Sequence, residues 1–228
     1  MPAFTVVGTS SVAIAGDGSV AIPVPSGTSV GDLLVVGFWG GAGCEVTDAR
    51  LTAVNRTGIG SPYNSGAYGV ATDLSDVTLT FTGYPRLAIV LALADVAPGF
   101  TGEALMQGTV ASLVFDESPG VAGIGFVCDI GTGFTPASVG GSADWDTQDH
   151  VTLAPELYDL RCFSFDGVSP VPALDVSFDP ATISRAGFRL LWPVPATSRP
   201  FLRQRQSPRA NPRVDLNRPN LRVRQVIP

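Results

Sequence analysis

Short apolar runs separated by glycine, proline, aspartate and serine extend from residue 4 to residue 194. With 26 glycines, 19 prolines and only 15% charged residues, the chain is poorly suited to long solvent-exposed helices. Its longest apolar run, residues 87–94, is far shorter than the roughly 20 residues of a membrane-spanning helix. The first residues also lack the basic-then-apolar pattern of a secretory signal. We therefore predict an all-β domain with no membrane partner.

Several of the apolar runs alternate with the period of a β-strand. Residues 77–81 place Val77, Leu79 and Phe81 on one face and two threonines on the other, and residues 174–178 repeat this pattern. In residues 87–93 large and small apolar side chains alternate, which is typical of a strand covered on both faces. These patterns favour a two-sheet antiparallel β-sandwich, jelly-roll-like, over residues 1–196.

The strand patterns also suggest an internal repeat. Residues 77–81, a turn, Arg86 and an apolar run correspond in order to residues 174–178, a turn, Arg185 and a second apolar run. Upstream, residues 33–39 are loosely echoed by residues 123–128. Two interpretations stay open: two pseudo-repeated halves, or a chance likeness between alternating strands.

The stretch from residue 197 to residue 228 differs in kind from the rest of the chain. All 14 basic residues are arginine, and eight of them lie here beside one acid, so this stretch carries a net charge of +7. Residues 1–196 hold six arginines and 19 acids, a net charge of −13. The stretch has five prolines and isolated apolar residues, so it cannot build a core of its own. It is either a solvated basic tail or an extended arm that lies on another protein.

A short motif recurs within this arm, and its partner can be inferred from charge. Residues 202–206 read Leu-Arg-Gln-Arg-Gln, and residues 221–225 read Leu-Arg-Val-Arg-Gln. Nucleic acid is a poor partner, because the acidic domain would be repelled by phosphates and Phe201 is the arm's one aromatic residue. An acidic protein surface fits better, since guanidinium groups pair with carboxylates. The predicted contact residues are Arg199, Phe201, Leu202, Arg203, Arg205, Arg209, Arg213, Leu216, Arg218, Leu221, Arg222 and Arg224.

Signals for catalysis are weak, and we predict that the chain is not an enzyme. His150 is the single histidine, and no Gly-x-Ser-x-Gly turn accompanies it. Glycines 40, 41 and 43 are not followed by the lysine and hydroxyl residue of a nucleotide-binding loop, and no cofactor is expected. The cysteines at positions 44, 128 and 162 form no metal-binding pattern, which predicts buried free thiols.

One acidic stretch is a candidate for binding a ligand or an ion. It comprises Asp144, Trp145, Asp146 and Asp149, but it lacks the glycine and closing glutamate of a calcium-binding loop, which favours a hydrated turn. An exposed Trp145 between two aspartates would provide a stacking surface for a sugar. Trp39 and Trp192 end apolar runs and are therefore expected in the core.

Four segments carry a family resemblance. They are Pro-Ser-Gly-Thr-Ser-Val-Gly-Asp-Leu-Leu-Val-Val at residues 25–36, the glycine-rich loop after it, the strand pair near residues 81–93 and the Leu-Arg-x-Arg-Gln tail. Together they resemble minor tail and related virion proteins of tailed phages that infect actinobacteria. The resemblance implies a structural β-sandwich protein, a minor tail or capsid-decorating component, without catalytic residues. Its expected partners are capsid or tail subunits and further copies of itself, within a virion assembled in the host cytoplasm. The alternative is a carbohydrate- or receptor-binding module that faces a host surface glycan.

Overall fold

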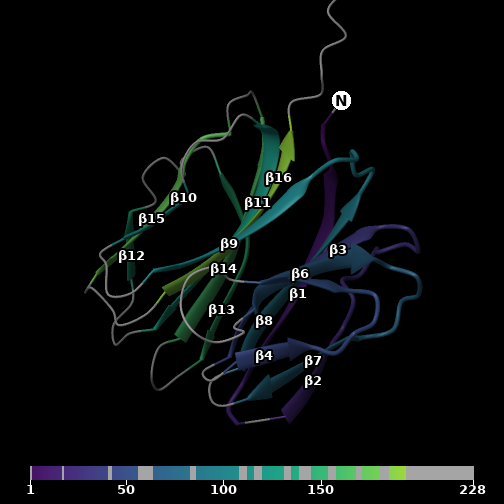
Figure 1. The fold of residues 1–228 in the computed structure, drawn as a ribbon, viewed down its shortest axis with the longest axis horizontal. Coiled ribbons are helices and arrows are strands. Elements are labelled where there is room, and N and C mark those ends of the chain that lie inside the picture. Colours follow the sequence, from purple (N-terminus) through teal and green to yellow (C-terminus); the bar gives the residue numbers. More distant parts are fainter. Residues whose placement is uncertain are drawn as a thin grey trace, which may run out of the picture. The chain divides into compact units, whose positions relative to one another are not determined.

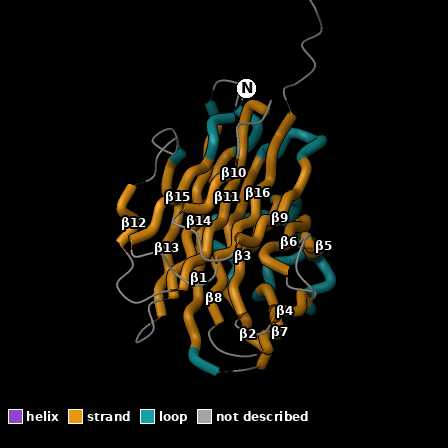
Figure 2. The backbone as a smooth tube through the Cα atoms, turned by 60° about the vertical axis from the view of Figure 1, so that its left-hand side comes forward, coloured by secondary structure: helices purple, strands orange, loops and turns teal. Residues whose placement is uncertain are grey.

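The computed structural model describes residues 2–16, 18–40, 43–55, 64–82, 86–107, 112–115, 120–130, 135–138, 145–153, 158–167, 171–179 and 185–193. Figure 2 shows these residues as strands and loops without a helix, and the all-β fold class is confirmed. Within this part of the chain, no helix is long and apolar enough to cross a membrane. Met1–Pro195 forms one compact unit. The arm of residues 197–228 lies outside the described residues, so its boundary and its contacts stay predictions.

The first eight strands form a jelly roll. A five-stranded sheet has the order β1-β8-β3-β6-β5, and a three-stranded sheet has the order β2-β7-β4, with antiparallel neighbours throughout (Figure 1). This alternation of strands between two sheets is the jelly-roll pattern. The strands are β1 (Thr5–Ile14), β2 (Gly18–Ile22), β3 (Leu33–Gly40), β4 (Gly43–Val46), β5 (Thr52–Asn55), β6 (Asn64–Val70), β7 (Val77–Thr82) and β8 (Arg86–Ala94).

The next eight strands repeat this topology. Their sheets have the orders β13-β14-β11-β16-β9 and β10-β15-β12, which result when eight is added to every strand number of the first half. The predicted correspondences fall on β7 and β15, β8 and β16, and β3 and β11, so the duplicated form of the predicted fold is the one observed. The strands are β9 (Thr101–Gln107), β10 (Ser112–Phe115), β11 (Gly120–Ile130), β12 (Thr135–Ser138), β13 (Asp146–Leu153), β14 (Tyr158–Asp166), β15 (Leu174–Asp179) and β16 (Arg185–Pro193).

The two five-stranded sheets pack face to face, and each three-stranded sheet covers the outer side of its own half. On β8, Leu87 and Ile89 belong to the central cluster between the halves, whereas Ala88 and Val90 belong to the cluster beneath β2-β7-β4. This explains why residues 87–93 are fully buried on both faces. A third cluster, which includes Phe163 and Leu174, lies beneath β10-β15-β12.

The packing between the halves resembles that of a two-fold symmetric dimer. Strand β1 contacts β13, and β5 contacts β9. Strand β9 is the repeat of β1, and β13 is the repeat of β5. Each half therefore places its first strand against the fifth strand of the other half. A reciprocal arrangement of this kind defines an isologous interface, which here joins two halves of one chain.

The interface is nevertheless asymmetric in its side chains. Gly37 pairs with Ile89 of β8, and Phe126 pairs with Phe188 of β16, so Gly37 and Phe126 occupy equivalent positions in the two halves. A methyl group on Gly37 would overlap the Phe126 ring, and one on Gly66 would overlap the Phe188 ring. The two rings stack with centroids 5.9 Å apart. The first half therefore supplies gaps that the second half fills with phenylalanine rings.

The core confirms two further predictions. Trp39 and Trp192 are buried, and the indole nitrogen of Trp192 donates a hydrogen bond to the Ala97 carbonyl at 3.0 Å. Cys44, Cys128 and Cys162 are buried thiols outside any disulfide. Burial raises the pKa of the Cys44 and Cys162 thiols, so these two sulfurs stay protonated near neutral pH and are poor nucleophiles.

Candidate functional site

The predicted exposure of Trp145 is wrong. This side chain is 5% exposed and packs against Phe165, with ring centroids 5.7 Å apart. A Cβ on Gly123 would lie 2.7 Å from the indole, so the missing side chain of Gly123 creates the space that Trp145 fills. The indole nitrogen donates to the Pro172 carbonyl at 3.3 Å. Trp145 is therefore a core residue and provides no stacking surface for a sugar.

The acidic residues after Trp145 lie on a strand and not in the predicted turn. Asp146 is exposed at the start of β13, which is an edge strand, and Asp149 accepts a hydrogen bond from the His150 backbone at 2.7 Å. Asp144 lies outside the described residues. Among the described residues, no group of three or more His, Cys, Asp or Glu side chains is placed to hold a metal ion.

His150 belongs to a charged cluster that links β13 to β14. Its Nε2 lies 2.6 Å from one carboxylate oxygen of Asp159, and Arg161 donates from Nε to the other oxygen at 3.1 Å. The Asp159 side chain is 2% exposed, and burial raises its pKa against the opposing charges of Arg161 and His150. Within the described part of the chain, no hydroxyl or thiol forms a hydrogen bond with the imidazole. The arrangement ties a sheet edge together.

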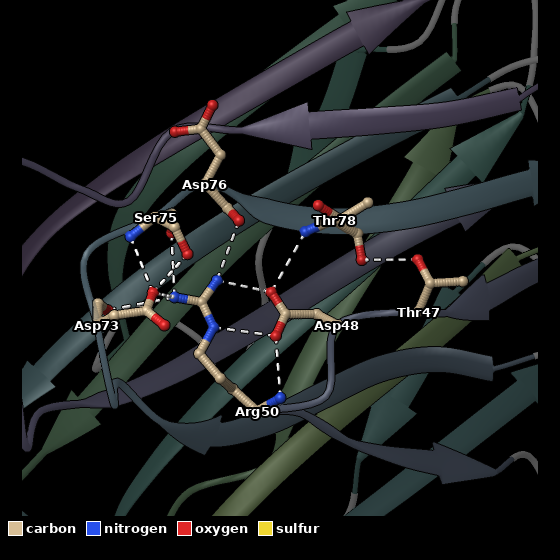
Figure 3. A network of polar contacts seen from close by, with 7 residues as sticks. All are labelled: Thr47, Asp48, Arg50, Asp73, Ser75, Asp76 and Thr78. Atoms are coloured by element: carbon tan, nitrogen blue, oxygen red, sulfur yellow. Dashed lines mark hydrogen bonds and ion pairs between the residues drawn. The ribbon is translucent and has the colours of Figure 1, made fainter.

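A second polar network, centred on Arg50, was not predicted from the sequence. It joins the segment after β4 to the loop between β6 and β7 (Figure 3). The Asp48 carboxylate accepts from Arg50 Nε at 2.9 Å and from Arg50 Nη2 at 2.6 Å. Nη1 binds the Asp73 carboxylate at 2.8 Å and the Ser75 carbonyl at 3.0 Å, and Nη2 also binds the Asp76 carbonyl at 3.0 Å. The loop is thus wrapped around the guanidinium group.

Local sequence explains how this network forms. Asp48 also accepts a hydrogen bond from the Arg50 backbone at 2.9 Å, which closes a tight turn. A side chain on Gly69 of β6 would overlap the Arg50 carbonyl, so only glycine lets the turn cross this strand so closely. The Asp48 and Arg50 side chains are 7% and 8% exposed. Every nitrogen of the guanidinium is already hydrogen-bonded, so Arg50 serves as a structural clasp and not as a ligand-binding group.

An open depression of about 550 Å³ lies beside the clasp, over the three-stranded sheet of the first half. Figure 3 shows the Asp76 carboxylate turned away from Arg50, which binds the Asp76 carbonyl, and within the described residues this carboxylate forms no hydrogen bond or ion pair. The lining is polar and contains no aromatic ring. It comprises Ser19, Thr47, Asp48, Ala49, Arg50, Asp73, Ser75, Asp76, Thr78 and Thr80.

The clasp is expected to make stability depend on pH. The hydrogen bonds from Arg50 hold the pKa of the Asp48 carboxyl below its usual range. A carboxyl whose folded-state pKa is depressed stabilises the fold above its unfolded pKa of about 4 and loses this contribution as pH falls through the folded value. Urea titrations should therefore show that the unfolding free energy of the wild type exceeds that of Asp48→Asn by about 2 kcal/mol at pH 5. This difference should shrink as the pH is lowered toward 2.5. A difference that stays constant with pH would contradict this assignment.

The fold and these contacts define a duplicated jelly-roll protein with a polar surface clasp. No protein-family model, curated protein or solved structure matches the chain. The basis for a function is therefore the chain's own fold, charge distribution and contacts.

Proposed function

We propose that the chain is a structural component of a phage virion, a minor tail or capsid-decorating protein without a catalytic step. It assembles through its β-sandwich and through a basic C-terminal arm that lies on a neighbouring copy. The observation that carries this proposal is the division of charge, −13 in residues 1–196 and +7 in residues 197–228. The jelly-roll topology supports it, because jelly rolls recur in viral capsid proteins. The resemblance of residues 25–36 and of the arm motifs to phage virion proteins supports it further.

Opposite charges on one chain favour contacts between copies. An arginine-rich arm is attracted to the acidic domain of another molecule, and bidentate guanidinium–carboxylate pairs add geometric specificity. Proline-rich segments are restricted before they bind, so they lose less conformational entropy on docking than flexible segments do. Exposed carboxylates such as Asp76 and Asp146 remain available on the described surface.

Removal of residues 197–228 is expected to abolish self-association while the β-sandwich stays folded. Sedimentation velocity should show oligomers of the full chain in 50 mM salt and monomers of the truncated chain. Raising the salt to 500 mM should weaken association of the full chain, because ions screen exposed charge pairs. Circular dichroism of the truncated chain controls for folding. Equal association of the two chains would contradict the assembly role.

The virion assignment needs a separate test. Particles purified from a lysate of the encoding phage should contain the chain in stoichiometric amounts, as measured by quantitative mass spectrometry. Its presence in the lysate but not in the particles would contradict a structural role in the virion.

A glycan-binding role is the alternative, favoured by the open depression with its hydroxyl and carboxylate lining. We place it second because the predicted platform, Trp145, is buried and the lining contains no aromatic ring. Binding of the truncated chain to a glycan array, lost on substitution of Thr78 and Thr80, would favour this alternative.

A further inference from the structure

We propose that the depression beside the Arg50 clasp, together with its apolar rim, receives residues 201–205 of the arm of a second copy. This inference rests on the proposed function and names the surface that the arm contacts. It is argued from the exposed apolar residues at the rim, the carboxylates beside them and the side-chain pattern of residues 201–205.

We call three exposed residues the apolar rim: Leu74, which lies between Asp73 and Ser75 of the lining, and Val70 and Val30 on the segments joined to this loop. These are the large hydrophobic residues that the described part of the chain exposes, at 64%, 51% and 53% respectively. The segments that carry them are joined, because Gly31 donates to the Ala71 carbonyl and the Ala71 backbone donates to the Asp32 carbonyl, both at 2.8 Å. Exposed apolar side chains on joined segments offer contact area to an apolar group of a partner.

Carboxylates lie within the same loop as Leu74. The Asp73 side chain is 59% exposed and uses one oxygen for Arg50 and Ser75. The Asp76 carboxylate is exposed, and within the described residues it accepts no hydrogen bond and forms no ion pair. The surface thus combines exposed apolar groups with an unneutralised negative charge, and a complementary segment would carry an apolar side chain and arginines.

Residues 201–205, Phe-Leu-Arg-Gln-Arg, match this requirement. In an extended segment alternate side chains share one side at intervals of about 7 Å. In that conformation Phe201, Arg203 and Arg205 would share one side, with the aromatic ring first and the two guanidinium groups after it. The ring would cover the apolar rim while the guanidinium groups pair with Asp73 and Asp76.

The position of the arm's origin favours a second copy over the same chain. The last described residues of β16 lead into the arm. Figure 1 and Figure 2 place the end of β16 beside the N-terminus, on the opposite side of the domain from β2, β4 and β7. The depression lies over these three strands, because its lining includes Ser19 of β2 and Thr78 and Thr80 of β7.

The test is charge reversal at Asp76, measured by sedimentation of the full chain. Asp76→Arg should raise the dissociation constant for self-association about tenfold or more, because a repulsive pair replaces an attractive one. Asp146→Arg is the matched control, since Asp146 is also an exposed acid but lies on the second half, and it should leave the constant unchanged. Arg203→Asp combined with Asp76→Arg should restore association, and thermal melting verifies that each variant folds.

The outcomes separate this inference from the proposed function. If the arm deletion abolishes association while Asp76→Arg and Leu74→Ser associate like the wild type, the arm assembles copies elsewhere and the docking site is wrong. If the deletion has no effect, the proposed function fails as well. If Asp76→Arg and Asp146→Arg weaken association equally, general charge and not this surface governs assembly, which also overturns the docking site.

Discussion

Replacing Phe126 with alanine is expected to destabilise the domain by about 4 kcal/mol, as measured by urea denaturation. The ring is 1% exposed in the central cluster, and its removal leaves a cavity between two rigid sheets. Gly37→Ala should cost about 2 kcal/mol, because the added methyl group overlaps the same ring and the ring cannot easily move. The double variant Gly37→Ala/Phe126→Ala should lose clearly less unfolding free energy than the two single losses added together. Without the Phe126 ring the added methyl group has nothing to overlap, and the methyl group occupies part of the space that the ring leaves.

Phe163→Ala provides the matched control for this cycle. Phe163 is a buried ring of similar size, but it lies in the outer cluster of the second half and not between the halves. Its loss should destabilise the domain comparably and add to the effect of Gly37→Ala without coupling. Additive behaviour of Gly37→Ala with Phe126→Ala would contradict the described interface.

Arg50→Ala is expected to cost about 3–5 kcal/mol of unfolding free energy, because it leaves the buried Asp48 carboxylate without its partner. The loop of residues 71–76 would also lose the hydrogen bonds that its carbonyls make to the guanidinium. The combined Asp48→Asn and Arg50→Met variant should be less destabilised than Arg50→Ala alone, since no buried charge remains.

Asp73→Asn tests whether the loss is specific to the buried pair. Asp73 contacts the same guanidinium, but its side chain is mostly exposed, so its substitution should change stability by no more than about 1 kcal/mol. Equal losses for Asp73→Asn and Arg50→Ala would mean that burial does not govern the strength of this network.

The fold class could be predicted because it depends on local patterns, whereas the repeat was one of two interpretations that these patterns left open. Alternation in residues 77–81 and 87–93 indicates which faces of a strand are covered, but its recurrence at residues 174–178 fits a second copy of the same unit and a chance likeness equally well. The packing of the halves could not be predicted in this way. Gly37 is required because the Phe126 ring packs against it, and the two residues are separated by 88 residues in the sequence, so no local pattern predicts their contact.

The site predictions failed where burial depends on residues distant in sequence. Trp145 lies between two aspartates in a polar stretch, so it was expected to be exposed, but Gly123 and Phe165 form a buried space for it. The Arg50 clasp was missed because its partners come from two loops. The one local signal was the spacing of Asp48 and Arg50, which permits a turn closed by the aspartate side chain.

The duplication bears on assembly. In one chain the two jelly rolls already form a dimer-like pair, so the facing sides of their five-stranded sheets cover each other. The phenylalanines of the second half fit the glycines of the first, whereas two copies of the second half would place Phe126 against Phe126. This asymmetry favours pairing within a chain and leaves the outer surfaces and the arm for the contacts between chains that we propose.

A density map of the native assembly, traced outward from Trp192, tests the central claim most directly. The account predicts that residues 197–228 run extended across a neighbouring copy, with Phe201 at the apolar rim and an arginine beside Asp76. Density that follows the chain's own sandwich, or an assembly in which these residues contact no other protein, would contradict it.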